Sequence, residues 1–233
     1  MIKKLVSLFF PPRCPFCANV LPPHLSICDD CLENLPYIED NSCEICGKEL
    51  GEFSHKICSE CKGEKRYFIK SFVPLKYSSL SKRAIVRMKY YHHPSYAKAF
   101  AILIAEKFLK DAGEDISFDL ITYVPQNKLT ALVRGFNQSE LIANHLSEIF
   151  NIPCKGTLIR TNDGVRQATL NKRERRENVR KCYFKGDVEI NGNVFLVDDV
   201  YTTGATANYC ARLLKSMGAK KVYLGVAAIR CEE

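Results

Sequence analysis

The stretch from Asn193 to Thr206, NVFLVDDVYTTGAT, constrains the fold of this chain more than any other. Val194 to Val197 is a short apolar run of β-favouring residues, which predicts a strand buried on both faces of a parallel sheet. Two adjacent carboxylates, Asp198 and Asp199, follow the run and precede a turn rich in Thr and Gly. We expect a helix from about Ala205 to Met217, with a glycine directly after its end.

This turn is a candidate phosphate site. Its backbone N–H groups and the positive end of the helix dipole can hold a phosphate, while the two carboxylates can accept hydrogen bonds from ribose hydroxyls. An acidic helix cap is the structural alternative, but a cap needs only one such residue. The expected ligands of a 5′-phosphate are Val200, Tyr201, Thr202, Thr203, Gly204, Ala205 and Thr206.

The residues from Val194 to Thr206 also resemble a known signature. It is the 5-phosphoribosyl-1-pyrophosphate (PRPP) signature of the type I phosphoribosyltransferases, in which four apolar residues precede two acids and a T-T/S-G-x-T turn. The resemblance implies that Asp198 and Asp199 hold the ribose hydroxyls and that the turn binds the 5′-phosphate. It also implies Mg²⁺, held mostly by oxygens of PRPP.

Eight of the 12 cysteines lie before residue 62 as four C-x-x-C pairs. Two such pairs supply the four thiolates of a tetrahedral Zn²⁺ site, because each knuckle provides two ligands on one tight turn. We therefore predict two structural zinc sites with no open position for catalysis. The expected ligands are Cys14, Cys17, Cys28, Cys31, Cys43, Cys46, Cys58 and Cys61.

The eight cysteines of these pairs could also form disulfides or a redox motif. A disulfide framework would need an oxidising compartment, and a thioredoxin-like redox motif would need a strand and a helix around one pair. The pairing of the knuckles can be sequential or interleaved. Similar spacings within each half, and Gly47 after the third pair, favour the sequential pairing. A module of about 60 residues depends on its metal, because it is too small for much of a core.

The cysteine-rich residues 1–64 are expected to form one domain and residues 65–233 a second. Strands separated by helices predict an α/β fold for the second domain. The expected strands are 67–77, 119–124, 155–160, 194–197 and 222–229. A basic helix is expected near residues 80–89, followed by another that Pro94 begins.

Charge and hydropathy restrict the surroundings and partners of the chain. The net charge of +8 favours anionic partners without specifying one. The apolar run Leu5 to Phe10 is shorter than that of a signal peptide, and no later run approaches the ~20 residues of a membrane span. We therefore expect a cytoplasmic protein that does not insert into membranes.

A second motif follows the strand expected at 119–124. Pro125-Gln126-Asn127-Lys128 comes first, and Arg134-Gly135-Phe136-Asn137-Gln138 then leads into a helix to Phe150. Asn137 and Glu140 have the spacing of a capping box at the start of that helix.

Together with the cysteine pairs, this motif resembles the competence protein F (ComF/ComFC) family, bacterial double-zinc-ribbon proteins with a phosphoribosyltransferase domain. The resemblance implies a type I phosphoribosyltransferase fold, a parallel-sheet core with flanking helices, behind a small double zinc-ribbon module. It places Pro125, Gln126, Asn127 and Lys128 in the pyrophosphate loop. The family often has basic residues further on, where this chain has Leu129 and Thr130, so Lys128 is expected to supply the charge.

An arginine-rich segment after residue 159 resembles the flexible flap of type I phosphoribosyltransferases. Its cations could close on a pyrophosphate leaving group. The alternative is a solvated helix face balanced by Glu174 and Glu177. The resemblance implies the catalytic candidates Asp198, Asp199, Arg173 and Arg175.

Two functional hypotheses follow from the resemblance. In the first, the chain acts in DNA uptake and natural transformation and binds PRPP or another 5-phosphoribosyl ligand. Single-stranded DNA and proteins of the competence machinery are then the expected partners. In the second, it is an active, PRPP-dependent phosphoribosyltransferase of purine or pyrimidine salvage or synthesis. Residues 65–117 carry no base-binding fingerprint, so the acceptor is unspecified.

Overall fold

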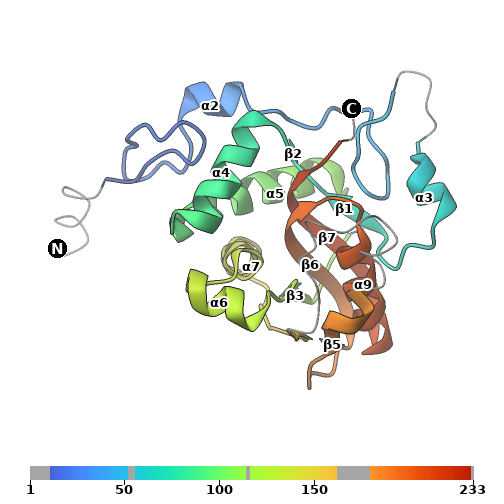
Figure 1. Cartoon of the computed structure of the whole chain (residues 1–233). Coiled ribbons are helices and arrows are strands. Elements are labelled where there is room, and N and C mark those ends of the chain that lie inside the picture. The colour runs from blue at the N-terminus through green and yellow to red at the C-terminus, as the bar shows by residue number, and fades with distance from the viewer. Residues whose placement is uncertain (1–10, 52–55, 114–115, 162–178, 232–233) are drawn as a thin grey trace.

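The computed structural model describes residues 11–51, 56–113, 116–161 and 179–231 (Figure 1). The helices are α2 (Asp29–Glu33), α3 (Ser59–Gly63), α4 (Ser79–Tyr90), α5 (Ala97–Asp111), α6 (Lys128–Arg134), α7 (Gln138–Phe150) and α9 (Ala205–Ser216), with a 3₁₀ turn at Pro94–Tyr96. The strands are β1 (Lys70–Phe72), β2 (Leu75–Lys76), β3 (Leu120–Tyr123), β4 (Leu158–Arg160), β5 (Tyr183–Lys185), β6 (Gly192–Tyr201) and β7 (Ala219–Ile229).

A parallel sheet forms the centre of the molecule, with strand order β1-β7-β6-β3 and β2 also paired with β7. Val194 to Val197 are fully buried in β6, as their uninterrupted apolar sequence predicts for an inner strand. The expected α/β class, with a parallel sheet and flanking helices, is confirmed.

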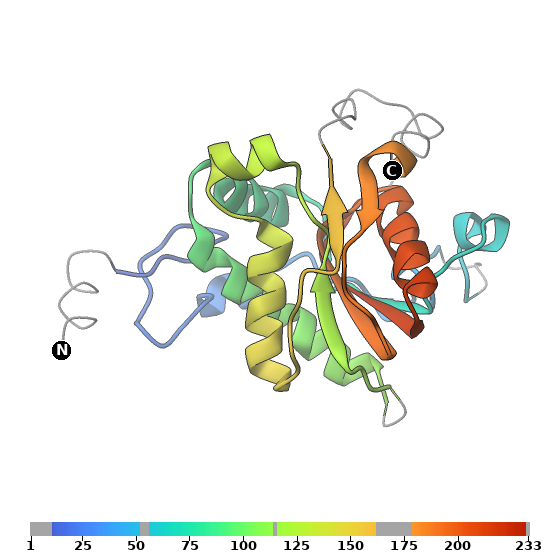
Figure 2. The same cartoon turned by 90° about the horizontal axis from the view of Figure 1, so that it is seen from below.

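The side chains of β6 divide the core into two layers, because successive residues of a strand point to opposite faces. Phe195 and Val197 pack in one buried cluster with residues of α5 and α7, and Val194 and Leu196 pack in another with residues of α9. Figure 2 shows this arrangement, with α7 in yellow on one side of the sheet and α9 in red on the other.

Two of the expected strands differ from the observed ones. The segment 67–77 forms two short strands, β1 and β2, because Pro74 between them lacks the N–H that a continuous ladder would use. The segment 155–160 does not join the central sheet. Its strand β4 pairs antiparallel with β5 in a separate two-stranded sheet. The start of the segment contacts β3 through an isolated bridge between Cys154 and Ile121, in which the Lys155 N–H donates to the carbonyl of Ile121 (3.0 Å).

The two cysteine-rich modules contact opposite layers of the core. Residues 14–31, here called the first ribbon, share a buried cluster with α4 and α5, and the ring of Phe16 lies 5.8 Å from that of Phe100. Residues 43–61, the second ribbon, contribute their cysteines to the α9 layer.

The domain boundary predicted at residue 64 stays a prediction. Within the described ranges, no helix is both long and apolar enough to cross a membrane.

Candidate functional site

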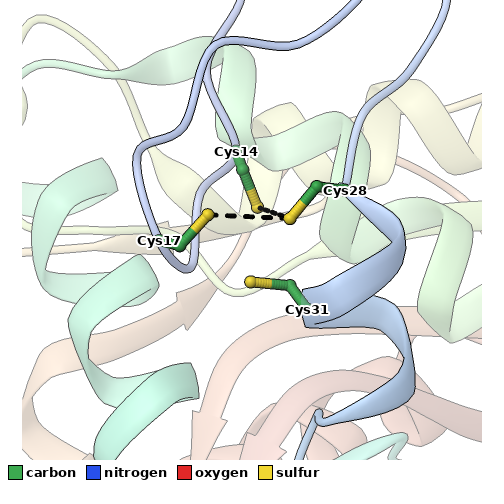
Figure 3. Close-up of side chains that lie close together, drawn as sticks. All are labelled: Cys14, Cys17, Cys28 and Cys31. Atoms are coloured by element: carbon green, nitrogen blue, oxygen red, sulfur yellow. Dashed lines mark hydrogen bonds between the residues drawn. The ribbon is translucent and has the colours of Figure 1, made fainter.

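The eight cysteines of the C-x-x-C pairs form two groups of four, one in each ribbon. Within each group all four sulfur atoms lie within 4.8 Å of one another. In the first ribbon, the four side chains point toward a common centre (Figure 3). The sequential pairing is therefore confirmed, and the interleaved pairing is excluded.

The spacing of the sulfurs fits zinc. Four ligands at about 2.3 Å from a tetrahedral Zn²⁺ stand about 3.8 Å apart. The Sγ atom of Cys28 lies 3.6 Å from that of Cys17 and 3.7 Å from that of Cys14, and Cys46 and Cys58 are also 3.7 Å apart. Each ribbon thus has the donor set and the geometry of a closed structural zinc site.

A buried arginine beside the second ribbon supports metal binding there. The side chain of Arg66 is 4% exposed, and its Nε and Nη2 have no hydrogen-bond partner among the described residues. Burial lowers the pKa of Arg66, but Tyr201 and Cys61 outweigh this effect and hold the pKa above its usual value. Nη1 of Arg66 is paired with Glu64 (3.5 Å), and four zinc-bound thiolates, which carry a net negative charge, would add a counter-charge beside this guanidinium.

A cavity of about 390 Å³ opens beyond the carboxyl ends of β3 and β6. Ligands of open parallel sheets bind at such ends. The predicted residues that line it are Pro125, Gln126, Asp198, Asp199, Val200, Tyr201, Thr202, Gly204, Ala205 and Thr206. The acid pair, the turn and the start of the loop after β3 are thus brought together.

Other predicted residues lie elsewhere. Asn127 caps α6, where its Oδ1 accepts hydrogen bonds from the N–H groups of Leu129 (2.8 Å) and Thr130 (3.3 Å). Lys128 is the exposed first residue of that helix and does not line the cavity. Thr203 does not line the cavity either. Its Oγ1 accepts a hydrogen bond from the N–H of Ala205 (3.4 Å). Arg173 and Arg175 lie outside the described residues.

The acid pair lies within β6 and not after its end as expected. The strand runs on to Tyr201, because Asp198 and Tyr201 continue the pairing with β7. Oδ1 of Asp198 accepts hydrogen bonds from the Ser139 hydroxyl (3.2 Å) and the Asp199 N–H (2.9 Å). The carboxylate of Asp199 forms an ion pair with Nζ of Lys89 from α4.

The two carboxylates have different electrostatic environments. Burial, and then the charge of Asp199, raises the pKa of Asp198 to about 7. Burial disfavours the charged form of Lys89, but the carboxylate of Asp199 outweighs it and raises the pKa of the lysine. Near neutral pH, Asp198 can therefore either donate or accept a hydrogen bond, while Lys89 stays charged.

The turn is shaped by Gly204 and Tyr201. Gly204 precedes α9 with a φ of 70°, in the left-handed region that favours glycine. A Cβ atom at this position would collide with the hydroxyl of Tyr201. Tyr201 is only 3% exposed, its ring contacts Phe68 at 6.4 Å, and its hydroxyl has no hydrogen-bond partner in the described part of the chain.

The R-G-F-N-Q motif fastens the loop after β3 to the start of α7. Asn137 donates from Nδ2 to the carbonyl of Val124 (3.0 Å), and its Oδ1 accepts from the N–H of Ser139 (3.1 Å), which confirms it as the helix cap. The predicted partner in the cap, Glu140, instead accepts from the hydroxyl of Tyr123 (2.8 Å).

Arg134 of the same motif is held by neutral groups. Its Nη1 donates to the side-chain oxygens of Gln138 (2.7 Å) and Gln126 (3.4 Å), and its guanidinium lies 5.2 Å from the ring of Tyr90. No described carboxylate lies within 4.0 Å of it, so its charge is uncompensated. Gln138 is 3% exposed, and its Nε2 has no partner among the described residues.

Four cationic side chains of the described residues line the cavity, namely Lys89, Arg134, Arg160 and Arg230. Arg160 begins the segment expected to form the flap, whereas the other three were not expected at the site. Arg134 could have been found, because it lies in the same motif as the predicted helix cap. The sequence gives no signal for Lys89 or Arg230, since folding alone brings them to the acid pair.

Comparison with known proteins agrees with this organisation. Residues 5–64 match a family model described as a double zinc ribbon domain. The chain is 29% identical over 207 residues to competence protein ComFC of Bacillus subtilis (85% of this chain, 82% of the relative). It is 26% identical over 230 residues to competence protein F of Haemophilus influenzae (92% and 95%). It is also 27% identical over 204 residues to DNA utilization protein YhgH of Escherichia coli K12 (85% and 88%).

Solved structures resemble the chain more remotely. A glutamine PRPP amidotransferase from B. subtilis has a TM-score of 0.36 at 22% identity and covers 56% of this chain and 25% of that chain. A purine phosphoribosyltransferase from Pyrococcus horikoshii has a TM-score of 0.32 at 22% identity, covering 57% and 71%. The predicted resemblance to competence protein F and the predicted zinc-ribbon module are confirmed by the sequence relatives and the family model.

Proposed function

From the similarity to competence protein F, we propose that this protein handles DNA during natural transformation and that its cavity binds PRPP or another 5-phosphoribosyl ligand. The 5′-phosphate binds the turn from Thr202 to Thr206, and the ribose hydroxyls bind Asp198 and Asp199. The observation that carries this proposal is the convergence of the acid pair and the phosphate turn on one cavity. Single-stranded DNA and competence-machinery proteins are its proposed partners, and the cytoplasm its proposed location.

The charges of the cavity suit such a ligand. Among the described residues, its lining carries four cationic side chains against two carboxylates, one of which is paired with Lys89. A cleft with an excess of one sign of charge attracts ligands of the opposite sign, and a phosphoribosyl pyrophosphate is a polyanion. Lys89 therefore lowers the repulsion that the acid pair would exert on the ligand.

The pyrophosphate end of the ligand is proposed to bind near Arg134. The uncompensated guanidinium and the unpartnered Nε2 of Gln138 are the donors that favour an anion there. Pro125, Gln126, Asn127 and Lys128 remain the proposed pyrophosphate loop, and Arg173 and Arg175 remain proposed cations. Mg²⁺ would be held mainly by ligand oxygens, because Asp199 is paired with Lys89 and Asp198 accepts from Ser139.

Ligand-induced stabilisation tests the site. PRPP with Mg²⁺, at about 100 times its Kd, should stabilise the fold by ~2.7 kcal/mol and raise the melting temperature. The double substitution Asp198→Asn/Asp199→Asn should remove the shift. The exposed pair Asp187→Asn/Glu189→Gln is the matched control and should keep it. No shift in the unsubstituted protein would overturn the proposal.

Catalysis is tested separately from binding. In the alternative function, a nitrogen nucleophile of the acceptor displaces pyrophosphate at C1′ through an oxocarbenium-like state, and no protein residue acts as nucleophile. Nucleobases can be screened for pyrophosphate release from PRPP. Release with one base would favour the salvage alternative, whereas binding without release would favour a phosphoribosyl-binding competence protein.

A further inference from the structure

A second, smaller cavity lies beside the first turn of α9. It has a volume of about 240 Å³ and is bounded by the segment 64–67, by α9 and by Arg180. Of the described residues that line it, only Ala205 also lines the larger cavity. The two cavities therefore flank the same helix turn but offer different side chains to a ligand.

The walls of this second cavity are held by specific hydrogen bonds. The Tyr67 N–H donates to Oδ1 of Asn208 (2.8 Å), and Nδ2 of Asn208 donates to the carbonyl of Lys65 (3.0 Å). The Tyr67 ring lies 5.3 Å from Nζ of Lys65 and 5.9 Å from the guanidinium of Arg212. Asn208 thus holds the segment 64–67 against α9, and the cations of Lys65 and Arg212 both lie close to the ring of Tyr67.

The charge around this cavity is strongly unbalanced. Among the described residues that line it, Lys65, Arg66, Arg180 and Arg212 are cationic, and Glu64 is the only acidic one. Glu64 lies 3.5 Å from Arg66. Among the described residues, no carboxylate is within 4.0 Å of the other three cations. Holding like charges together is unfavourable without an anion between them.

We propose that this second cavity is a phosphate-binding site. Lysine and arginine donors surround a space that suits a phosphate group. Hydrogen bonds from these charged donors to a phosphate are about twice as strong as hydrogen bonds between neutral groups. The phosphate can belong to a small nucleotide-like anion or to a nucleic-acid strand. The site does not depend on the proposed PRPP site. Neither the acid pair nor any residue of the predicted phosphate turn except Ala205 lines it.

A fluorescent reporter can test this site alone. The chain contains no tryptophan, so Tyr67→Trp places a single indole between the two cations while the backbone N–H to Asn208 remains. Two probes are titrated against this variant, inorganic pyrophosphate and an oligothymidylate strand. At least one should change the emission saturably, and the effective probe identifies the source of the phosphate.

Second substitutions in the reporter decide the outcome. Arg212→Ala should weaken the response about tenfold, the loss of one good charged contact. Lys221→Ala, which removes an exposed cation elsewhere, should not weaken it. The response should persist in Asp198→Asn/Asp199→Asn, which separates this site from the PRPP site. No emission change with either probe, or a response that Arg212→Ala leaves intact, would overturn the proposal.

Discussion

The two zinc ribbons have the same ligand set but support different halves of the candidate site. The first ribbon packs against α4 and α5, and Nη1 of Arg87 on α4 donates to the carbonyls of Pro15 and Phe16 (3.1 Å each). The same helix carries Lys89, the partner of Asp199. The second ribbon shares a buried cluster with Tyr201, whose hydroxyl lies under the glycine of the turn.

This difference gives the duplicated module two separate structural roles. One ribbon braces the helix that places a cation on the acid pair, and the other braces the turn proposed to hold the phosphate. A metal-stabilised module can therefore influence a distant cavity without contributing a ligand to it. Selective damage to either ribbon should disturb one half of the site first.

Metal removal should have the largest effect. Cys28→Ser/Cys31→Ser and Cys58→Ser/Cys61→Ser should each reduce the zinc content from about two to about one per chain. Each should lose stabilisation on the order of 10 kcal/mol in the affected ribbon. Elemental analysis and amide hydrogen exchange check this. The first variant should expose α4 and the second the start of α9; loss of protection in the same segments would contradict separate roles.

Deleting one buried ring on each side is the next test. Phe16→Ala and Phe68→Ala should each lower the free energy of unfolding by about 3–5 kcal/mol, because both rings are buried. Urea denaturation measures the loss. Phe184→Ala removes a ring that is 45% exposed and should change the stability by less than about 0.5 kcal/mol. A loss with Phe16→Ala no larger than this control would show that the first ribbon does not brace the core.

The acid pair should respond oppositely to two similar substitutions. The pKa of Asp198 is raised to about 7 from 3.8, so the folded state binds more protons than the unfolded state between these values. Stability should therefore fall as the pH rises from 4 to 7. Asp198→Asn should remove this fall and stabilise the fold at pH 8 by on the order of 3 kcal/mol.

Asp199→Asn should instead destabilise the fold by about 1–3 kcal/mol, because it leaves Lys89 without its carboxylate partner. Thermal melts of both variants at pH 5 and pH 8 provide the comparison. The same pH dependence in Asp198→Asn as in the unsubstituted protein would contradict the assigned pKa shift.

The smallest effect is expected beneath the turn. Tyr201→Phe removes a buried hydroxyl without a partner among the described residues, so it should stabilise the fold by about 1 kcal/mol. Gly204→Ala should destabilise it, and should do so less in the Tyr201→Phe background, since the collision is with that hydroxyl. Equal costs in both backgrounds would refute the contact. A weaker PRPP shift in Tyr201→Phe would identify the hydroxyl as a ligand group.

Features encoded locally could be predicted from the sequence. The cysteine pairs, the strand before Asp198 and the glycine turn each need only a short run of residues. Features created by assembly could not. Lys89 contacts Asp199 only when α4 and β6 are brought together by folding. Lys128, which was expected in a loop, is the first residue of α6, because Asn127 caps that helix. The motif around Asn137 was recognised, but its role in tying a loop to α7 required the tertiary contacts.

The strand order has a consequence for synthesis on the ribosome. β7 follows all other described strands in the chain, yet it lies between β1 and β6. β1 and β2 therefore wait for their neighbour until nearly the whole described chain has been translated, although both ribbons can bind zinc long before. Such non-local pairing slows folding. In a growing chain, the metal-bound ribbons would thus stand folded beside an unfinished sheet.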